Sequence, residues 1–472
     1  MKQYLEWERQ SAILPIVLCL EAWIEPTRKY FGKPWPDTYL KYEGNVVSWY
    51  TKMDGLHDFG QLIIDLHYNG MNEFLIQTKN LAKKIDAMRN ELDIVNLIAL
   101  SDPGLLEIYK NVCSLYTDWF VLGAVCEPVG IKGEYLVSKL VNHASNPDKA
   151  LCLLTTTARK SFSKRELEEL FAIAIKFKEG IAVDELLSSH SKKWFWLHNN
   201  YFKTEVLTTE YFKNELKTLL SKYPTPGEYL TEMELATKQM ITEKNKLISE
   251  LKLREKEKQL IEILDFHAWY QDYRKEYIMI LLHYLDVVLR EIATRKQLTL
   301  EDVKWLLREE VIGLFQGKNF NALIRERKKY AFFVWENDKF GSFAGEDARK
   351  KEKEILGHIK TSKEIIEIPG NIANKGKVRG IARVTMNSSE AKHLTKGEIL
   401  VTSMTSPDFI SAIKKAAAIV TNEGGILCHA AIVSREFGIP CIVGTGIATK
   451  SIKNGDLIEV DANHGFVRIL KR

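Results

Sequence analysis

Cysteine is scarce in this sequence and follows no recurring spacing. Six cysteines occur in 472 residues, and no two of them form the Cys-x-x-Cys spacing of a zinc or redox site. They are spread over the whole chain, at Cys19, Cys113, Cys126, Cys152, Cys428 and Cys441. This pattern predicts no disulfide framework and no bound metal, and it favours the reducing environment of the cytoplasm.

Long hydrophobic runs are missing as well. Residues 12–20 form an apolar stretch near the N-terminus, but the stretch is only nine residues long and contains Pro15. A membrane-spanning helix needs about 20 apolar residues. A signal peptide needs a basic start, which the acidic Glu6 and Glu8 do not provide. The sequence therefore predicts a buried element of a soluble protein and no membrane partner.

A strong excess of charge of one sign is also absent. The formal net charge is +5, from 67 basic and 62 acidic residues. Charged side chains of alternating sign fill residues 254–258, which is typical of a solvated helix face rather than of a nucleic-acid patch. We therefore expect no nucleic-acid partner.

The first 360 residues lack the patterns of two common catalytic folds. No eightfold alternation of strands and helices argues for a TIM barrel, and no glycine-rich phosphate loop follows a predicted strand. Apolar residues recur instead at three- and four-residue steps, which predicts helices over most of residues 71–315. Two of these are expected over residues 231–265 and 266–295. Short hairpins are predicted near residues 42–50 and 330–343.

A histidine behind a glycine turn is present near the C-terminus. Residues 416–420 are small and apolar and predict a buried strand. Gly424 and Gly425 allow a turn with positive φ. His429 follows at or just before the start of a short helix, which Gly438 ends.

The position of His429 predicts a definite chemistry. The N-terminus of a helix favours an anion, because its unpaired N–H groups and its dipole present positive charge. A neutral imidazole is a competent nucleophile near pH 7, since its reference pKa is about 6.5. We therefore expect His429 to carry a phosphoryl group that Gly424, Gly425 and Cys428 stabilise. The alternatives are a satisfied buried histidine and a cysteine that only packs. The other histidines, such as His267, give no comparable signal.

The same stretch resembles the phosphohistidine domain, also called the swivelling or mobile domain, of the phosphoenolpyruvate-utilising enzymes. This family includes phosphoenolpyruvate synthase, pyruvate phosphate dikinase, enzyme I of the sugar phosphotransferase system and rifampicin phosphotransferase. The matching motifs are Gly424-Gly425, Cys428-His429, Ala431-Ile432-Val433, Arg435-Glu436 and Gly438-Ile439-Pro440. The resemblance covers residues 366–472 and implies that His429 is the phosphoryl-carrying nucleophile.

Two positions of the motif need comment. Arg435 lies six residues beyond His429 and is a candidate for phosphate stabilisation, but pairing with Glu436 or another neighbour is an alternative. Several family members carry a threonine two residues before the histidine, which is a regulatory phosphorylation site in pyruvate phosphate dikinase. This chain has Leu427 there, so the resemblance implies no regulation by that route.

The expected fold class is an α+β multi-domain protein. A mostly helical domain is predicted over residues 1–360, a linker over 361–375, and a small α/β phosphohistidine domain over 376–472. The layout resembles the C-terminal two-thirds of rifampicin phosphotransferase without its ATP-grasp domain. In that enzyme the helical domain binds the acceptor, which implies acceptor or partner binding by residues 1–360 here.

Two aromatic and polar clusters are the candidates for an acceptor site. The first lies in residues 194–201 and the second in residues 269–276, where Gln271, Asp272 and Lys275 follow helical spacing. The candidate substrate-binding residues are Trp196, Asn200, Trp269, Asp272 and Arg274. The alternative is ordinary aromatic packing with a charged helix end.

A site that would load the histidine is not recognisable in the sequence. In the family this is an ATP-grasp domain or, in enzyme I, a phosphoenolpyruvate-binding barrel. The resemblance therefore implies a separate ATP-grasp partner of the pyruvate phosphate dikinase type, with ATP and Mg²⁺ at the partner's site and no cofactor on this chain. The first hypothesis is a phosphotransferase component that acts between such a donor, or phosphoenolpyruvate, and a small-molecule acceptor. The alternative is a non-catalytic binding or regulatory protein that retains the fold.

Overall fold

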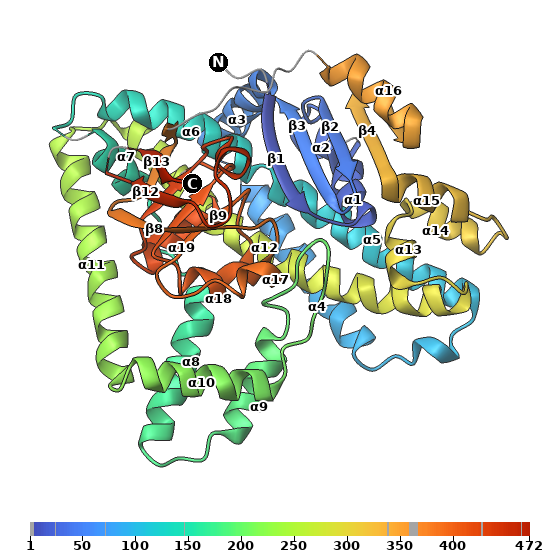
Figure 1. Cartoon of the computed structure of the whole chain (residues 1–472), viewed down its shortest axis with the longest axis horizontal. Coiled ribbons are helices and arrows are strands. Elements are labelled where there is room, and N and C mark those ends of the chain that lie inside the picture. The colour runs from blue at the N-terminus through green and yellow to red at the C-terminus, as the bar shows by residue number, and fades with distance from the viewer. Residues whose placement is uncertain are drawn as a thin grey trace.

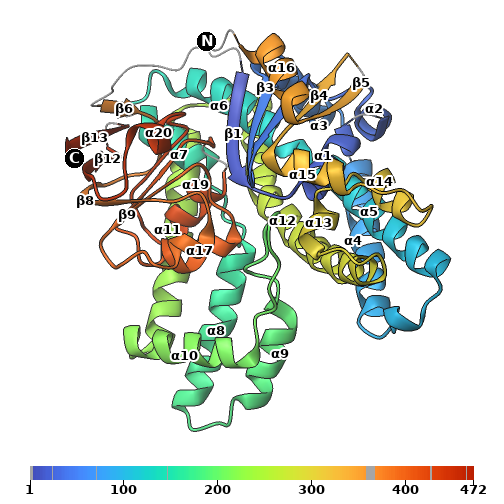
Figure 2. The same cartoon turned by 45° about the vertical axis from the view of Figure 1, so that its right-hand side comes forward.

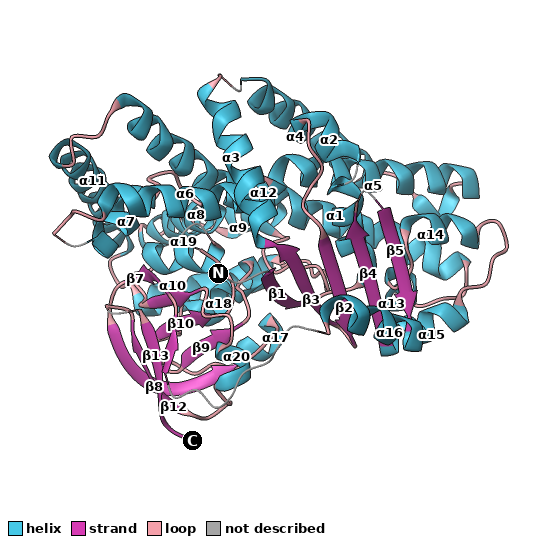
Figure 3. Ribbon diagram, turned by 90° about the horizontal axis from the view of Figure 1, so that it is seen from above, coloured by secondary structure: helices cyan, strands magenta, loops and turns pink. Residues whose placement is uncertain are grey.

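The computed structural model describes residues 4–23, 25–70, 72–145, 147–337, 339–357, 367–425, 428–463 and 465–472. The fold is an α+β multi-domain layout, as the sequence predicts, with two separate sheets and a largely helical middle part. Figure 1 shows the chain passing from a blue sheet through the helices to the red C-terminal part. Seen from above, the two sheets lie side by side, with most of the helices on one side of them (Figure 3). None of the described helices is both long enough and apolar enough to span a membrane.

The first sheet joins segments from both ends of the helical part. Its five strands are antiparallel, in the order β1-β3-β2-β4-β5. The strands are β1 (Tyr4–Gln10), β2 (Thr38–Glu43), β3 (Val46–Lys52), β4 (Tyr330–Glu336) and β5 (Lys339–Ala344). The hairpins expected near residues 42–50 and 330–343 thus occur as β2–β3 and β4–β5. They belong to one sheet because β2 pairs directly with β4.

Both faces of β4 are covered, which explains its continuous apolar sequence. Successive side chains of a strand point to opposite faces. Phe332 and Val334 pack with the helix α16 (Gly345–Leu356). Phe333 and Trp335 face the main core, which contains the helix α1 (Ile13–Trp23). The short apolar stretch near the N-terminus is therefore a buried helix, as predicted.

The remaining helices of the middle part surround the long helix α12, and α8, α9 and α10 project away from the rest (Figure 2). They are α2 (Glu25–Phe31), α3 (Met53–Tyr68), α4 (Asn72–Leu92), η1 (Leu97–Ala99), α5 (Asp102–Ala124), α6 (Cys126–Val141), α7 (Pro147–Thr155), α8 (Phe162–Lys178), α9 (Asp184–Trp194), α10 (Thr209–Lys222), α11 (Pro226–Glu250), α12 (Glu255–Arg295), α13 (Leu300–Lys304), α14 (Arg308–Leu314) and α15 (Asn321–Lys329).

One predicted helix boundary is wrong. The sequence predicts a helix over residues 231–265 and a second from 266, but α11 ends at Glu250 and α12 is one helix of 41 residues. The break follows from Lys252, which adopts a positive φ of 49°. Neither glycine nor proline marks this break, so the apolar spacing alone could not reveal it.

The second sheet is formed by the last hundred residues. Its eight strands have the order β6-β13-β12-β8-β9-β10-β11-β7. The strands are β6 (Glu367–Pro369), β7 (Asn371–Asn374), β8 (Lys377–Val384), β9 (Ile399–Thr402), β10 (Ala418–Thr421), β11 (Cys441–Val443), β12 (Leu457–Asp461) and β13 (Phe466–Lys471). Short helices connect them: α17 (Ser388–Ala391), η2 (Pro407–Phe409), α18 (Ile410–Ile413), α19 (His429–Glu436) and α20 (Ala448–Ser451). Strands β8 to β11 are parallel.

Each face of this sheet has its own core. Leu400 and Ile419 pack on one face with the side chains of α19, whereas Val401 and Val420 pack on the other. The predicted linker 361–375 is shorter than expected, since residues 367–374 form β6 and β7 of the sheet. Residues 361–366 of that prediction lie outside the described residues.

Candidate functional site

His429 lies where two parallel strands end at one edge of the second sheet. Strands β9 and β10 pair in register, with Thr421 opposite Thr402. The chain after each strand therefore leaves the sheet at the same edge, where open α/β sheets place their ligands. The segment after β9 supplies Thr405, and the segment after β10 supplies His429, the first residue of α19.

The turn before the histidine requires a glycine at position 424 and leaves little room for a side chain at position 425. Gly424 has a φ of +103°, and a Cβ there would lie 2.6 Å from the Cys428 sulfur. A Cβ on Gly425 would lie 2.9 Å from Oε2 of Glu134, which belongs to α6. Both positions therefore depend on close backbone approach. Leu427, which the resemblance aligned with a regulatory threonine, lies outside the described residues.

Cys428 caps α19. Its sulfur accepts the N–H of Ala431 at 3.4 Å, and its own N–H donates to the Gly425 carbonyl at 3.0 Å. Burial raises the pKa of the Cys428 thiol. These backbone donors are already paired, so Cys428 serves the helix start, and its N–H is not available to a phosphate in this arrangement.

His429 is held at one ring nitrogen and open at the other. The side chain is buried, with the residue 3% exposed, and Nδ1 lies 2.8 Å from Thr405 Oγ1. Nε2 is also buried, but it has no hydrogen-bond partner among the described residues. Burial and the nearby charge of Lys275 hold the pKa of His429 well below its usual value. The imidazole is therefore neutral near pH 7, with one free ring nitrogen.

The cation beside this histidine comes from the helical part. Lys275 lies on α12, and its charge contributes to the lowered pKa of His429. The same charge partly offsets the rise that burial causes in the pKa of Cys428. The sequence placed Lys275 in a candidate polar cluster but gave no reason to connect it with His429. The connection arises because α12 packs against α19.

Arg435 does not point to the histidine. Its Nε donates to the Ala373 carbonyl at 2.8 Å, at the sheet edge formed by β7. Six residues of helix also separate it from His429 by about 9 Å along the axis. The expected phosphate-stabilising role of Arg435 is therefore not supported by this geometry. Its neighbour Glu436 does not pair with it but bonds to Ser161.

Hydrogen bonds hold the C-terminal part against the helical part. Ser161, the N-cap of α8, donates its Oγ to Glu436 Oε2 at 2.8 Å. Asn200 Nδ2 donates to Asp408 Oδ2 at 2.7 Å. Burial raises the pKa of Glu436 to about 7 and also raises the pKa of Asp408. Asn200, predicted to bind substrate, thus makes an interface contact.

Asp272 also serves this interface region. Its Oδ2 accepts the N–H of Phe162 at 2.5 Å, at the start of α8, while Oδ1 is buried without a partner in the described structure. Burial raises the pKa of Asp272 to about 8, with a contribution from the nearby charge of Glu436. This candidate substrate residue therefore lies beneath the contact between α8 and α19.

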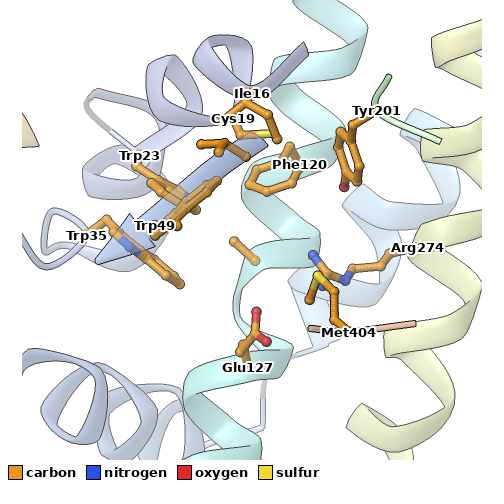
Figure 4. A pocket seen from close by; sticks show the side chains of 12 residues that line it. Ile16, Cys19, Trp23, Trp35, Trp49, Phe120, Glu127, Tyr201, Arg274 and Met404 are labelled. Carbon is orange, nitrogen blue, oxygen red and sulfur yellow. The ribbon is translucent and has the colours of Figure 1, made fainter. Parts of the chain in front are cut away.

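A small aromatic pocket borders the loop that positions the histidine. Its walls come from α1, the first sheet, α5 and α12, and they include Trp23, Trp49 and Phe120. Arg274 and Met404 lie together on the opposite side (Figure 4). The pocket encloses about 50 Å³. Because Met404 precedes Thr405, this pocket borders the loop that positions His429.

Two other candidate substrate residues do not line this pocket. Trp196 is buried, donates its indole N–H to the Lys193 carbonyl at 3.0 Å and packs against Phe162. Trp269 stacks on Tyr273, with ring centroids 5.0 Å apart. Both have the ordinary packing roles given as the alternative, and of the predicted acceptor residues only Arg274 reaches the pocket beside His429.

Thr405 is the functional candidate that the sequence did not indicate. It lies in the loop before η2, and nothing in its local sequence points to a histidine 24 residues away. The register of β9 and β10 brings the two together. No group of three or more His, Cys, Asp or Glu side chains suited to a metal ion occurs in the described part of the chain.

Comparison with known proteins finds a family match in the C-terminal part of the chain. Residues 394–465 match the family described as PEP-utilising enzyme, mobile domain, which confirms the resemblance drawn from the motif. A probable phosphoenolpyruvate synthase from Archaeoglobus fulgidus is 46% identical over 120 residues, which are 25% of this chain and 16% of the relative. The phosphoenolpyruvate synthase of Pyrococcus furiosus is 53% identical over 95 residues, 20% of this chain and 12% of the relative.

The same segment occurs in a differently named protein. Chondramide synthase from Chondromyces crocatus is 47% identical over 104 residues, 22% of this chain and 3% of the relative. The matched segments thus span 16% or less of these relatives. Among solved structures, Thermococcus kodakaraensis aconitase X in its holo form aligns with 22% of this chain and 98% of its own, at 22% identity and a TM-score of 0.19. That score is too low to support an argument.

Proposed function

We propose that this chain is a phosphotransferase component that carries a phosphoryl group on His429 Nε2. The observation that supports this proposal most directly is that Nε2 is buried and lacks a hydrogen bond in the described structure. It belongs to an imidazole that burial keeps neutral and that Thr405 fixes through Nδ1. The match of residues 394–465 to the mobile-domain family supports the same chemistry.

The two transfer steps balance without a cofactor on this chain. In the loading step Nε2 attacks the phosphorus of the donor, an N–P bond forms, and the P–O bond to the donor breaks with its electron pair on the leaving oxygen. In the unloading step an acceptor hydroxyl oxygen attacks the phosphorus, the N–P electron pair returns to Nε2, and the hydroxyl proton passes to solvent. With Nδ1–H donating to Thr405 Oγ1, the lone pair of Nε2 is available. Lys275 offsets the negative charge of the phosphoryl group.

The burial of His429 implies that the C-terminal part must move. At 3% exposure the histidine cannot reach a donor bound to another protein. Undocking requires breaking hydrogen bonds between the two parts, such as Ser161–Glu436 and Asn200–Asp408. These bonds can form again when the C-terminal part returns. In the docked arrangement the loop that positions His429 borders the aromatic pocket of the helical part, so we assign the acceptor to the helical part and loading to the undocked form.

The donor belongs to the proposal as well. Phosphoenolpyruvate synthases resemble this chain only in the histidine segment. A separate ATP-grasp protein, which would hold ATP and Mg²⁺, is the donor that we propose first, and phosphoenolpyruvate is the second. The acceptor that we propose is a small molecule with a nucleophilic oxygen.

Labelling tests this proposal directly. The purified chain is incubated with a candidate ATP-grasp partner and γ- or β-labelled ATP, and separately with labelled phosphoenolpyruvate. We expect a protein-bound label that acid removes and base does not, as for a phosphohistidine. His429→Ala should abolish the label, whereas His393→Ala, an exposed histidine of the same segment, should retain it.

The alternative is a non-catalytic binding protein in which the histidine stays permanently docked. Absence of label from both donors, with an ATP-grasp partner that labels another mobile domain in parallel, supports this alternative and overturns the carrier role. Label that persists in His429→Ala would instead move the carrier to another residue.

A further inference from the structure

A second cavity lies behind the histidine helix. It encloses about 590 Å³ between the C-terminal half of α19 and the helices α7, α8 and α11. It shares no lining residue with the aromatic pocket beside His429. Its volume falls in the range of about 300–1,000 Å³ that is usual for small-molecule sites. The cavity is therefore large enough for a ligand of its own.

The wall of this cavity carries more positive than negative charge. Four basic residues line it, Arg159, Lys164, Lys375 and Arg435, against the two acidic residues Glu232 and Glu436. Burial raises the pKa of Glu436 to about 7, and its carboxylate already accepts a hydrogen bond from Ser161. The lining thus favours an anion.

Two of these cations form no ion pair with a described carboxylate. Lys164 Nζ donates to Thr237 Oγ1 at 3.0 Å, and its charge acts on Glu436 without an ion-pair contact between the two described side chains. Arg435 bonds through Nε to the Ala373 carbonyl, while its buried Nη2 finds no partner in the part of the chain that is described. A buried guanidinium N–H without an acceptor is costly, and an oxygen of a ligand would satisfy it.

The rest of the wall is apolar. Leu153 and Met233 lie on the helical side, and Ile432 and Phe437 lie on α19. Flexible methionine side chains adapt to irregular ligands. The wall thus has a basic part and an apolar part. A ligand with an anionic head group and an apolar body fits such a wall better than an inorganic ion does. We propose that this cavity binds a small amphipathic organic anion and joins the histidine helix to the helical part.

Binding there would affect the docking of the histidine. The ligand would contact Ile432 and Arg435 of α19 together with Lys164 of α8. A ligand that contacts both parts binds the docked form better and so increases its population. This consequence rests on the proposed movement of the C-terminal part, whereas the binding itself does not.

Calorimetric titration of the full chain tests the site with defined probes. Phenyl phosphate and benzoate supply two anionic head groups on an apolar body. Phenol is their neutral counterpart, and inorganic phosphate lacks the apolar body. We expect at least one aromatic anion to bind, and phenol not to bind. Lys164→Ala should weaken that binding about tenfold, since a charge-assisted hydrogen bond is lost. Lys178→Ala, an exposed lysine on the same helix, should bind like the wild type.

Further variants keep the outcome interpretable. Lys375→Ala provides a second lining change if Lys164→Ala fails to fold by circular dichroism. His429→Ala should bind the anion normally, which separates this site from the phosphoryl-carrying role. Binding that is equal in Lys164→Ala, Lys375→Ala and the wild type, or no binding of either aromatic anion, overturns the proposal. Inorganic phosphate that binds as tightly as phenyl phosphate overturns the role of the apolar wall.

Discussion

His429 and His267 are both buried, yet only one of them is suited to chemistry. Burial holds the pKa of each well below its usual value, and each has one ring nitrogen without a partner in the described structure. His267 lies in the middle of α12, where its Nε2 is 2.8 Å from His67 Nε2. His429 instead starts a helix at the carboxyl edge of parallel strands, with Thr405 at Nδ1 and the charge of Lys275 nearby.

The difference teaches that a depressed pKa does not by itself identify a functional histidine. Aromatic rings surround His267, with Phe266 and Tyr270 within 6.5 Å of its ring centroid. An anion would be costly there, because the described groups that contact the ring are aromatic side chains and another histidine. The surroundings of His429 supply a cation, a helix start and a loop that borders a pocket. The predictions below test whether these features separate the two histidines.

Removing the cation should have the largest effect. We expect Lys275→Met to slow the transfer of the phosphoryl group from His429 in the docked form about 10²-fold, the usual loss when one stabilising donor is removed from a transition state. The measurement is the rate at which the acid-labile label leaves the protein after the labelled donor has been removed. Lys275→Arg, which keeps the charge, should recover most of the rate. Equal rates in Lys275→Met and the wild type would show that the cation does not distinguish the two histidines.

Truncation of the packed histidine should affect stability and not labelling. We expect His267→Ala to lower the free energy of unfolding by about 2–4 kcal/mol, because it leaves a cavity and an unpaired His67. Urea unfolding measures this loss, and the label on His429 should be retained at temperatures where the variant is folded. A folded His267→Ala protein that takes no label would contradict the purely structural role of His267.

Loss of the ring-positioning contact should have a smaller effect on rate. Thr405→Val keeps the shape of the side chain but removes its oxygen, so we expect labelling to slow about tenfold, equivalent to about 1.4 kcal/mol. Thr405→Ser should restore the rate, and the NMR signal of the Nδ1 proton should change in the valine variant only. If Thr405→Ser labels as slowly as Thr405→Val, the effect of Thr405 comes from packing and not from positioning of the imidazole ring.

The smallest predicted effect concerns pH. The folded-state pKa of Glu436, about 7, is above its ordinary value of 4.5. The folded state therefore binds the proton more tightly, and this contribution to stability is complete below pH 4.5 and is lost as the pH rises through 7. We expect Glu436→Gln to remove on the order of 1 kcal/mol of pH dependence between pH 5 and 8, a reduced figure because the side chain is partly exposed.

Hydrogen exchange of the α8 and α19 amides, measured from pH 5 to 8, would localise this effect. Glu398→Gln is the matched control, since that carboxyl pairs with Arg383 within the C-terminal part and its pKa is lowered. If exchange depends on pH in the same way in the wild type and in Glu436→Gln, the pH dependence of stability comes from Asp272 or another carboxyl group.

Local pattern predicted the elements of the histidine segment well. The strand before the turn, the two glycines, the helix start at His429 and the following strand all lie within 26 residues. Such elements follow from spacing and backbone preference, which neighbouring residues decide among themselves. The same reasoning failed at Lys252, where a left-handed residue breaks a helix without a glycine, and at Arg435, whose guanidinium bonds to a strand that the sequence had assigned to a linker.

The sequence by itself determined that His429 begins a helix behind a glycine turn, because φ preference, capping and apolar spacing act over a few residues. Only the tertiary structure decided what faces that histidine. The parallel register of β9 and β10 brings Thr405 to Nδ1, and the packing of α12 on α19 brings the charge of Lys275. Those contacts join residues 24 and 154 positions apart, and they depend on strand pairing and on helix packing, which no local pattern encodes.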